Sequence, residues 1–152
     1  MMKNLFKLLA VCLLFVGCDS KIDMSPKEIK IDRDVCAHCK MVISSANYAA
    51  QIVTKEGRHY FFDDIGCAVA WLHLKDKETQ ENSFIYAADF QTAEWIDARK
   101  AYYTSGANSP MHYGFAAHKE ALEGVENFDF THVKKVILER DNEPNPMAHH
   151  MH

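Results

Sequence analysis

Sulfur-bearing side chains are concentrated in one short stretch of the chain. Cys36, Cys39 and Met41 form the pattern C-x-x-C-x-M. Thiolate and thioether sulfurs are soft donors, and soft donors select Cu(I) over the hard cations. A thioether also binds a metal ion without losing a proton, and it does not form disulfides. The pattern therefore indicates a candidate site for a soft metal ion.

Further donors of the same kind occur later in the chain. Met111 and His112 place a thioether beside an imidazole directly after Ser109-Pro110. The chain ends in a third group, Met147-Ala148-His149-His150-Met151-His152. Thioether and imidazole are both copper ligands in kind. Donors thus occur in both halves of the chain and in its tail.

Other interpretations of the cysteines stay open. In an oxidising compartment Cys36 and Cys39 could form a structural or redox disulfide. The same residues begin C-x-x-C-K, a rare variant of the haem-attachment sequence, whose usual form ends in histidine. Zinc would need a further ligand such as His38 or Cys67, and it would leave Met41 unexplained. A thioredoxin-like site is not favoured, because no βαβ pattern surrounds the pair.

Two further candidate donors have structural interpretations. Cys67 lies on the apolar side of a predicted helix with Val69 and Ala70 nearby, so we expect a buried core thiol rather than a ligand. Met111 could equally be a core residue, and its pairing with His112 favours the ligand role. We expect His59 to be a hydrogen-bonded histidine within a strand.

The N-terminus has the features of an export signal. A basic start at Lys3 and Lys7 precedes the apolar run 8–16, which is too short for a permanent membrane span. Gly17-Cys18 closes this run and resembles the bacterial lipobox, in which the cysteine carries acyl chains such as palmitate. We therefore expect a lipoprotein anchored at Cys18 in the cell envelope and facing the periplasm, on either the inner or the outer membrane. Removal of the signal and lipid modification of Cys18 leave an odd number of thiols, which favours a bound metal ion.

The chain alternates predicted strands and helices. We expect strands at 28–34, 48–54, 59–62, 83–88, 101–105 and 111–115, and helices from 65 to about 74, at 120–125 and at 130–139. Asp63 or Asp64 is expected to cap the first helix. The sequence H-Y-x-F occurs at 59–62 and again at 112–115, in a similar order of elements. These features predict an α+β protein of two related units that meet near 89–91, with one continuous sheet as the alternative.

The expected organisation has five parts. They are a signal peptide at 1–17, a tether at 18–27, a first α+β unit with the C-x-x-C-x-M site at 28–90, a second α+β unit at 91–140 and a flexible His/Met tail at 141–152.

Four motifs in this order resemble the NosL family. They are the lipobox, C-x-x-C-x-M, the run Tyr60-Phe61-Phe62-Asp63-Asp64-Ile65-Gly66-Cys67, and Ser109-Pro110-Met111. Members of that family are copper-binding lipoproteins that help to assemble the copper centres of nitrous oxide reductase. The resemblance implies two small ββαβ units and one Cu(I) held by thiolate and thioether. Lys40 stands where the family commonly has glycine.

By motif position, the resemblance assigns Cys39, Met41 and Met111 as the metal ligands. Cys36 and His112 are further candidates. The expected function is that of a membrane-anchored, periplasmic Cu(I) chaperone of denitrification. Its partner would be apo nitrous oxide reductase or the membrane complex that assembles its copper centres.

Composition excludes several function classes. The formal net charge of −4 offers no basic stripe for nucleic acid. The sequence contains no hydrolase triad, P-loop or dinucleotide fingerprint, so we expect neither an enzyme nor a small-molecule substrate. The alternatives are a periplasmic thiol–disulfide oxidoreductase using Cys36 and Cys39, a metal-buffering lipoprotein, and a scaffold whose sulfur residues are incidental.

Overall fold

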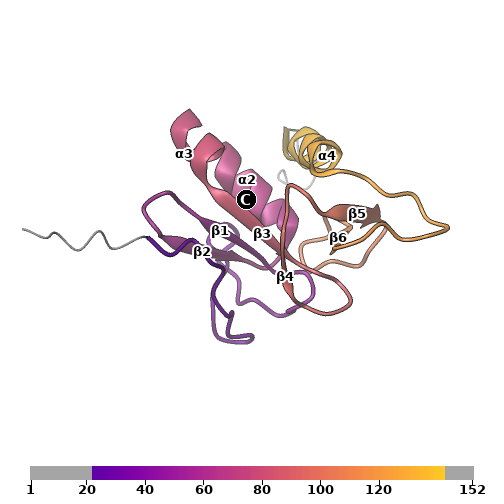
Figure 1. Ribbon diagram of the computed structural model, residues 1–152, viewed down its shortest axis with the longest axis horizontal. Coiled ribbons are helices and arrows are strands. Elements are labelled where there is room, and N and C mark those ends of the chain that lie inside the picture. The colour runs from indigo at the N-terminus through magenta and orange to yellow at the C-terminus, as the bar shows by residue number, and fades with distance from the viewer. Residues whose placement is uncertain (1–21, 143–152) are drawn as a thin grey trace, which may run out of the picture.

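The structure is a computed structural model that describes residues 22–142. A four-stranded antiparallel sheet has the order β2-β1-β3-β4, and a two-stranded antiparallel sheet pairs β5 with β6 (Figure 1). The strands are β1 (Ala50–Val53), β2 (His59–Phe62), β3 (Phe84–Ala88), β4 (Trp95–Asp97), β5 (Tyr102–Ser105) and β6 (Phe115–His118). The helices are α2 (Ile65–His73), α3 (Lys77–Asn82) and α4 (Phe130–Asn142). The predicted α+β class is confirmed.

The first hairpin forms where Glu56-Gly57 predicted a turn. Gly57 adopts a φ of 75°, a region that glycine enters without strain, and its amide donates to the carbonyl of Thr54 at 2.8 Å. β1 and β2 then pair from Ala50–Phe62 to Val53–His59. His59 Nδ1 donates to Gln51 Oε1 at 2.7 Å, as expected of a hydrogen-bonded strand histidine.

Helix α2 is the central element of the core. Its residues from Ile65 to Leu72 are all buried, as is typical of a helix that is apolar on every side. It packs against β1, β2 and α4 (Figure 1). One apolar cluster joins residues of both sheets and of α4, including Ile52, Tyr103 and Val133. The elements on either side of the predicted boundary at 89–91 therefore share a core, and β4 pairs with β3 in the larger sheet.

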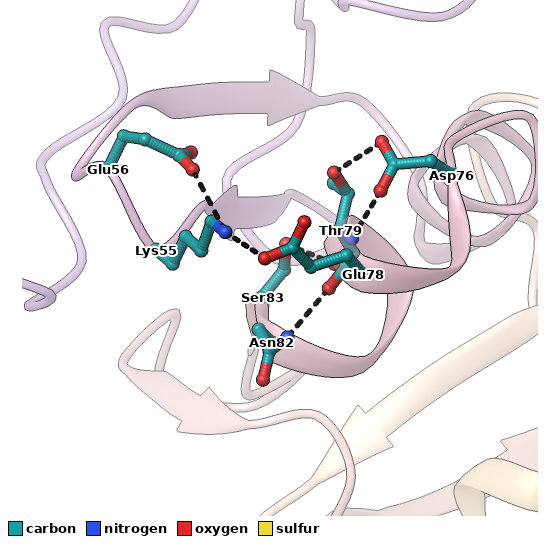
Figure 2. A network of polar contacts seen from close by, with 7 residues as sticks. All are labelled: Lys55, Glu56, Asp76, Glu78, Thr79, Asn82 and Ser83. Carbon is teal, nitrogen blue, oxygen red and sulfur yellow. Dashed lines mark hydrogen bonds and ion pairs between the residues drawn. The ribbon is translucent and has the colours of Figure 1, made fainter.

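Short-range polar contacts define α3. Asp76 accepts from the amide of Thr79 at 2.9 Å and from its hydroxyl at 2.8 Å, which is N-capping geometry. Figure 2 shows this cap and the ion pairs of Lys55 with Glu78 and Glu56, which connect α3 to the β1–β2 turn. None of the residues of α3 is buried, so the helix depends on these contacts.

Three predicted elements are wrong. Residues 31–33 form a turn rather than part of a strand at 28–34, because Asp32 adopts a φ of 61° and the carbonyl of Lys30 accepts from the amides of Arg33 and Asp34. A turn closed by Ser109 occupies the start of the predicted strand 111–115, and β6 begins only at Phe115. Residues 120–125 contain a turn instead of a helix, since Gly124 has a φ of 75°.

The H-Y-x-F repeat does not mark equivalent positions. His59–Phe62 forms the whole of β2, whereas the second copy leads from a turn into the first residue of β6. The order strand, strand, helix does recur as β1-β2-α2 and β5-β6-α4. Among the described residues a further strand follows the helix only in the first case.

The ends of the described region are attached to the core. Gln51 exchanges two hydrogen bonds of 2.9 Å with the backbone of Lys27, and the hydroxyl of Tyr86 donates to the carbonyl of Met24 at 2.9 Å. Residues 24–27, expected to be tether, therefore lie against the sheet. The predicted helix at 130–139 is confirmed and extends to Asn142, with Val133 and Ile137 buried one turn apart. The signal peptide, Cys18 and residues 143–152 of the tail lie outside the described residues.

No helix within residues 22–142 combines the length and apolar character needed to cross a bilayer.

Candidate metal site

The C-x-x-C-x-M segment folds as a tight loop. Val35 and Val42 form an isolated antiparallel bridge, and between them the amide of Cys36 donates to the carbonyl of Met41 at 2.8 Å. The amide of Lys40 closes the loop by donating to the carbonyl of Cys36 at 3.1 Å. Lys40 has a φ of 64°, in the left-handed region that glycine enters more readily than lysine does.

Two contacts hold this loop against the end of β2. The amide of Ala37 donates to the carbonyl of Phe61 at 2.8 Å. The carboxylate of Asp63 accepts from the amide of Ser44 at 2.9 Å, just beyond the loop. Asp63 is only 2% exposed, so this bond is shielded from water. The loop thus has a defined position relative to the start of α2.

Three thiols converge where this loop meets helix α2. The sulfurs of Cys36, Cys39 and Cys67 all lie within 4.8 Å of one another, and none forms a disulfide within residues 22–142. Two sulfurs that share a metal ion at about 2.3 Å each are at most about 4.6 Å apart. Three sulfurs arranged evenly around one ion at that distance are about 4 Å apart, so the cluster would contract by up to about 0.8 Å to bind one ion with all three.

Cys67 is the residue that sequence reasoning left out. It is fully buried in α2, as predicted, but it belongs to the thiol cluster as well as to the core. The N-cap at Asp64 places it one turn into the helix, facing the loop. The available signal was its position at the end of the run from Tyr60 to Cys67.

The three cysteines shift one another's pKa values so that one of them ionises readily. The thiol of Cys67 donates a hydrogen bond to the sulfur of Cys36, which lowers the pKa of Cys36 well below its usual range. Hydrogen bonds from the backbone amides of Asp63, Cys39 and His38 lower it further. The pKa of Cys67 rises because its thiol is the donor in that bond. Burial raises the pKa of Cys39. The arrangement favours a single negative charge in the cluster, centred on Cys36.

A second loop reaches the same end of α2. Asp64 accepts from the amide of Gly66 at 2.9 Å as N-cap, and its other oxygen accepts from the amide of Met111 at 3.4 Å. Ser109 is 1% exposed and holds the turn by accepting from the amide of Gly114 at 3.0 Å. Adjacent aspartates thus support different loops: Asp63 the loop of the cysteines and Asp64 the loop of Met111.

The predicted ligands differ in exposure. Cys36 is buried, Cys39 is half-buried, and Met111 is half-buried against the core. Met41 is 54% exposed. His112 is exposed, and its carbonyl accepts from Arg140.

These features define an α+β protein with a candidate metal site, in which two cysteines of a loop and one of α2 converge. The family model NosL matches residues 26–127, and the chain belongs to this family, as the sequence predicted. No curated protein matches the chain. The fold is similar to that in the "Crystal structure of the copper chaperone NosL from Shewanella denitrificans", with a TM-score of 0.58 and 15% identity over 72% of this chain and 95% of that chain.

Proposed function

We propose that this protein is a copper chaperone that holds one Cu(I) ion at the thiol cluster and passes it to a copper-requiring partner. The observation that carries the proposal is the convergence of Cys36, Cys39 and Cys67 within 4.8 Å. Soft donors select Cu(I), and the single negative charge suits a monovalent cation. The related fold of a protein described as a copper chaperone supports the same function.

The ligands in this proposal are Cys39, Met41 and Met111, with Cys36 and His112 as further candidates. We add Cys67, because its sulfur lies within the cluster. The bond between the amide of Met111 and the N-cap Asp64 supports Met111 as a candidate, because it ties the loop of Met111 to the helix that carries Cys67.

Delivery requires ligands that an acceptor can reach. Cys39 is half-buried and Met41 is 54% exposed, so one side of the loop is open to solvent. Neutral thioethers can be displaced one at a time without separating opposite charges. The open side is where an incoming donor would replace Met41 first.

The proposal also includes where the protein is anchored and which protein receives the copper. Lipid at Cys18 would anchor the chain to an envelope membrane, facing the periplasm. The acceptor would be apo nitrous oxide reductase or its copper-assembly membrane complex. Loss of nitrous oxide reductase copper in cells that carry a Cys18→Ala chain would support both points. Full copper loading in those cells would contradict the need for the anchor.

Anaerobic titration with Cu(I) against a competing chelator tests copper binding. We expect one ion per chain, with sulfur neighbours in the X-ray absorption spectrum of the loaded protein. Met111→Leu should weaken binding at least tenfold, and Met24→Leu, a methionine held against the sheet, should leave it unchanged. The absence of tight stoichiometric binding would overturn the proposal.

The lowered pKa of Cys36 also suits a thiol–disulfide oxidoreductase. That residue is fully buried, however, whereas an attacking thiol must be reached by its substrate. Met41→Leu separates the two functions, since a redox enzyme would keep its thiol-exchange rate and the copper site would weaken.

A further inference from the structure

Two adjoining hollows meet at His118, the last residue of β6. The larger hollow has a volume of about 560 Å³ and the smaller one about 310 Å³. His118, Gln91 and Leu122 line both of them, and we call the pair the His118 groove. None of the cysteines and methionines proposed as copper ligands lines it, so the His118 groove is distinct from the candidate metal site.

His118 has a hydrogen-bonding atom without a partner. The residue is only 3% exposed, and its Nε2 lies 3.1 Å from the hydroxyl oxygen of Thr104. Its Nδ1 is buried and has no hydrogen-bond partner within residues 22–142. Proteins pair nearly all of their buried polar atoms, because an unpaired one has lost its water without a replacement. A polar atom of a molecule seated in the His118 groove is the partner that Nδ1 lacks.

The larger hollow suits an aromatic ring. The rings of Tyr48 and Phe90 lie there with centroids 5.2 Å apart, and the ring of Phe90 meets that of His118 edge-on at 6.0 Å. Phe90 is 37% exposed and Val125 is 51% exposed, so apolar surface is left uncovered on this lining. Aromatic rings pack favourably against one another in tilted and edge-on arrangements. A further ring would therefore extend an existing aromatic cluster toward His118.

The smaller hollow suits a positive charge. Its lining contains Asp89, Glu94 and Glu120, the larger hollow adds Glu126, and Lys119 is the single lysine or arginine in either lining. Backbone amides already bind the carboxylate of Asp89, but the side chains of Glu94 and Glu120 are exposed. A guanidinium group forms paired hydrogen bonds with such carboxylates. An aromatic ring and a basic group side by side thus match the two hollows.

The position of the groove favours a protein as the source of these groups. Gly106, Ala107 and Asn108 line the larger hollow and lead directly into the loop of Met111. The amide of Ala107 donates to the carbonyl of Gly114 at 3.1 Å and so closes the base of that loop. A protein seated in the His118 groove would contact the same loop that carries a proposed copper ligand. Tyrosine and arginine are also the side chains that most often anchor protein interfaces.

We propose that the His118 groove is a docking site for a partner protein, which inserts a tyrosine ring into the larger hollow and an adjacent basic side chain into the smaller one. The hydroxyl of the inserted tyrosine pairs with Nδ1 of His118, and the basic group pairs with Glu94 and Glu120. No cysteine takes part, so this docking site does not rest on the proposed Cu(I) chaperone function.

The test is an NMR titration of the full chain, labelled with nitrogen-15, with capped dipeptide amides. Acetyl-tyrosyl-arginine amide carries both features of the proposed occupant. Acetyl-phenylalanyl-arginine amide lacks only the hydroxyl, and acetyl-tyrosyl-glutamate amide reverses the charge. The backbone amides that shift show where each dipeptide binds, and the titration curve gives its Kd.

We expect saturable binding of the tyrosyl-arginine dipeptide with a Kd of about 1 mM or lower, and amide shifts at Asn108 and Ala116 on the lining. Loss of the hydroxyl should weaken binding about tenfold, because Nδ1 of His118 stays unpaired. Reversal of the charge should weaken it about fivefold, with a smaller effect at high salt.

Variants of the protein test the two hollows separately. Phe90→Ala should weaken binding about tenfold, since it removes the ring on which the tyrosine packs. Phe84→Ala is its control: this ring is also half-exposed but lines neither hollow, so affinity should stay within about twofold. Glu120→Gln should weaken binding about threefold at low salt, whereas Glu139→Gln on α4 should not.

Three results would each overturn the proposal. The first is a lack of saturable binding, or amide shifts that lie outside the His118 groove. The second is equal affinity of the tyrosyl and phenylalanyl dipeptides, which would show that His118 makes no bond to the occupant. The third is equal affinity of the arginine and glutamate dipeptides. Loss of Cu(I) binding in cysteine variants would contradict only the proposed function.

Discussion

The carboxylate of Asp64 connects helix α2 to the loop of Met111. One oxygen caps the helix at the amide of Gly66, 2.9 Å away, and the other accepts from the amide of Met111 at 3.4 Å. Cys67 lies on the first turn of the helix that this residue caps. A single buried side chain therefore contacts both the first turn of α2, which carries Cys67, and the backbone of the loop that carries Met111.

Asp64→Ala should lower both stability and copper affinity. Loss of the cap should cost about 1–2 kcal/mol in the free energy of unfolding, measured in urea. Release of the Met111 loop should weaken Cu(I) binding in the same samples. Asp76→Ala is the matched control, because Asp76 caps the exposed helix α3, which carries none of the candidate ligands (Figure 2). Equal copper affinity in the two variants would show that the bond to Met111 does not position the ligand.

Cys67→Ala tests whether the buried thiol is a ligand. The exchange removes one sulfur from a cluster whose members lie within 4.8 Å, so Cu(I) affinity should fall at least tenfold, about 1.4 kcal/mol. Competition with a chelator measures this value. A fall in thermal stability with unchanged Cu(I) affinity would show that Cys67 has a purely structural role.

Gly66→Ala should destabilise the protein although it lies in a helix. Alanine is favoured over glycine in helices by about 1 kcal/mol. An added Cβ, however, would lie 2.1 Å from the ring of Tyr113, which donates to Asp141 and lies under Arg140. Overpacking of this kind costs about 1–3 kcal/mol, so we expect a net loss in urea unfolding.

The same substitution in a Tyr113→Ala background provides the control. Without the ring, Gly66→Ala should become neutral or stabilising, and the double-mutant cycle should show the coupling between the two positions. Equal effects in both backgrounds would contradict the packing of Tyr113 on α2.

Stability should fall as the pH drops below about 6.5, in part because of His118. Burial lowers the pKa of this histidine below its ordinary value, and the charge of Asp89 only partly opposes the shift. The pKa of His118 is thus lower in the folded chain than in the unfolded chain. At a pH between these two values the unfolded chain binds a proton that the folded chain does not, so the free energy of unfolding decreases as the pH falls.

Urea unfolding between pH 7.5 and pH 5 measures this dependence. His118→Gln should reduce the slope, whatever it does to stability at pH 7.5. An unchanged slope for His118→Gln would mean that this group binds protons equally in both states.

Local patterns predicted most elements of the fold. The hairpin at 48–62 was predicted from β-prone residues on both sides of Glu56-Gly57. Helix α2 was predicted from an apolar run after a capping aspartate, and α4 from apolar residues spaced along one face. The failures share a cause. Residues 31–33 and 120–125 look regular in sequence, but hydrogen bonds to distant or irregular partners, such as Asp32 to Ile43, stabilise turns there. The pairing of β4 with β3 could not be predicted from the sequence either, because a three-residue strand carries too little pattern to identify its partner.

By itself the sequence determined the family, the α+β class and the chemistry of the C-x-x-C-x-M loop, since all three depend on residue type and short spacing. Only the tertiary structure decided that Cys67 joins Cys36 and Cys39, and that Asp63 and Asp64 support different loops. A buried thiol and a ligand thiol look alike in sequence. They differ in which side chains the folded chain brings within a few ångströms, and that depends on the packing of α2 against loops far away along the chain.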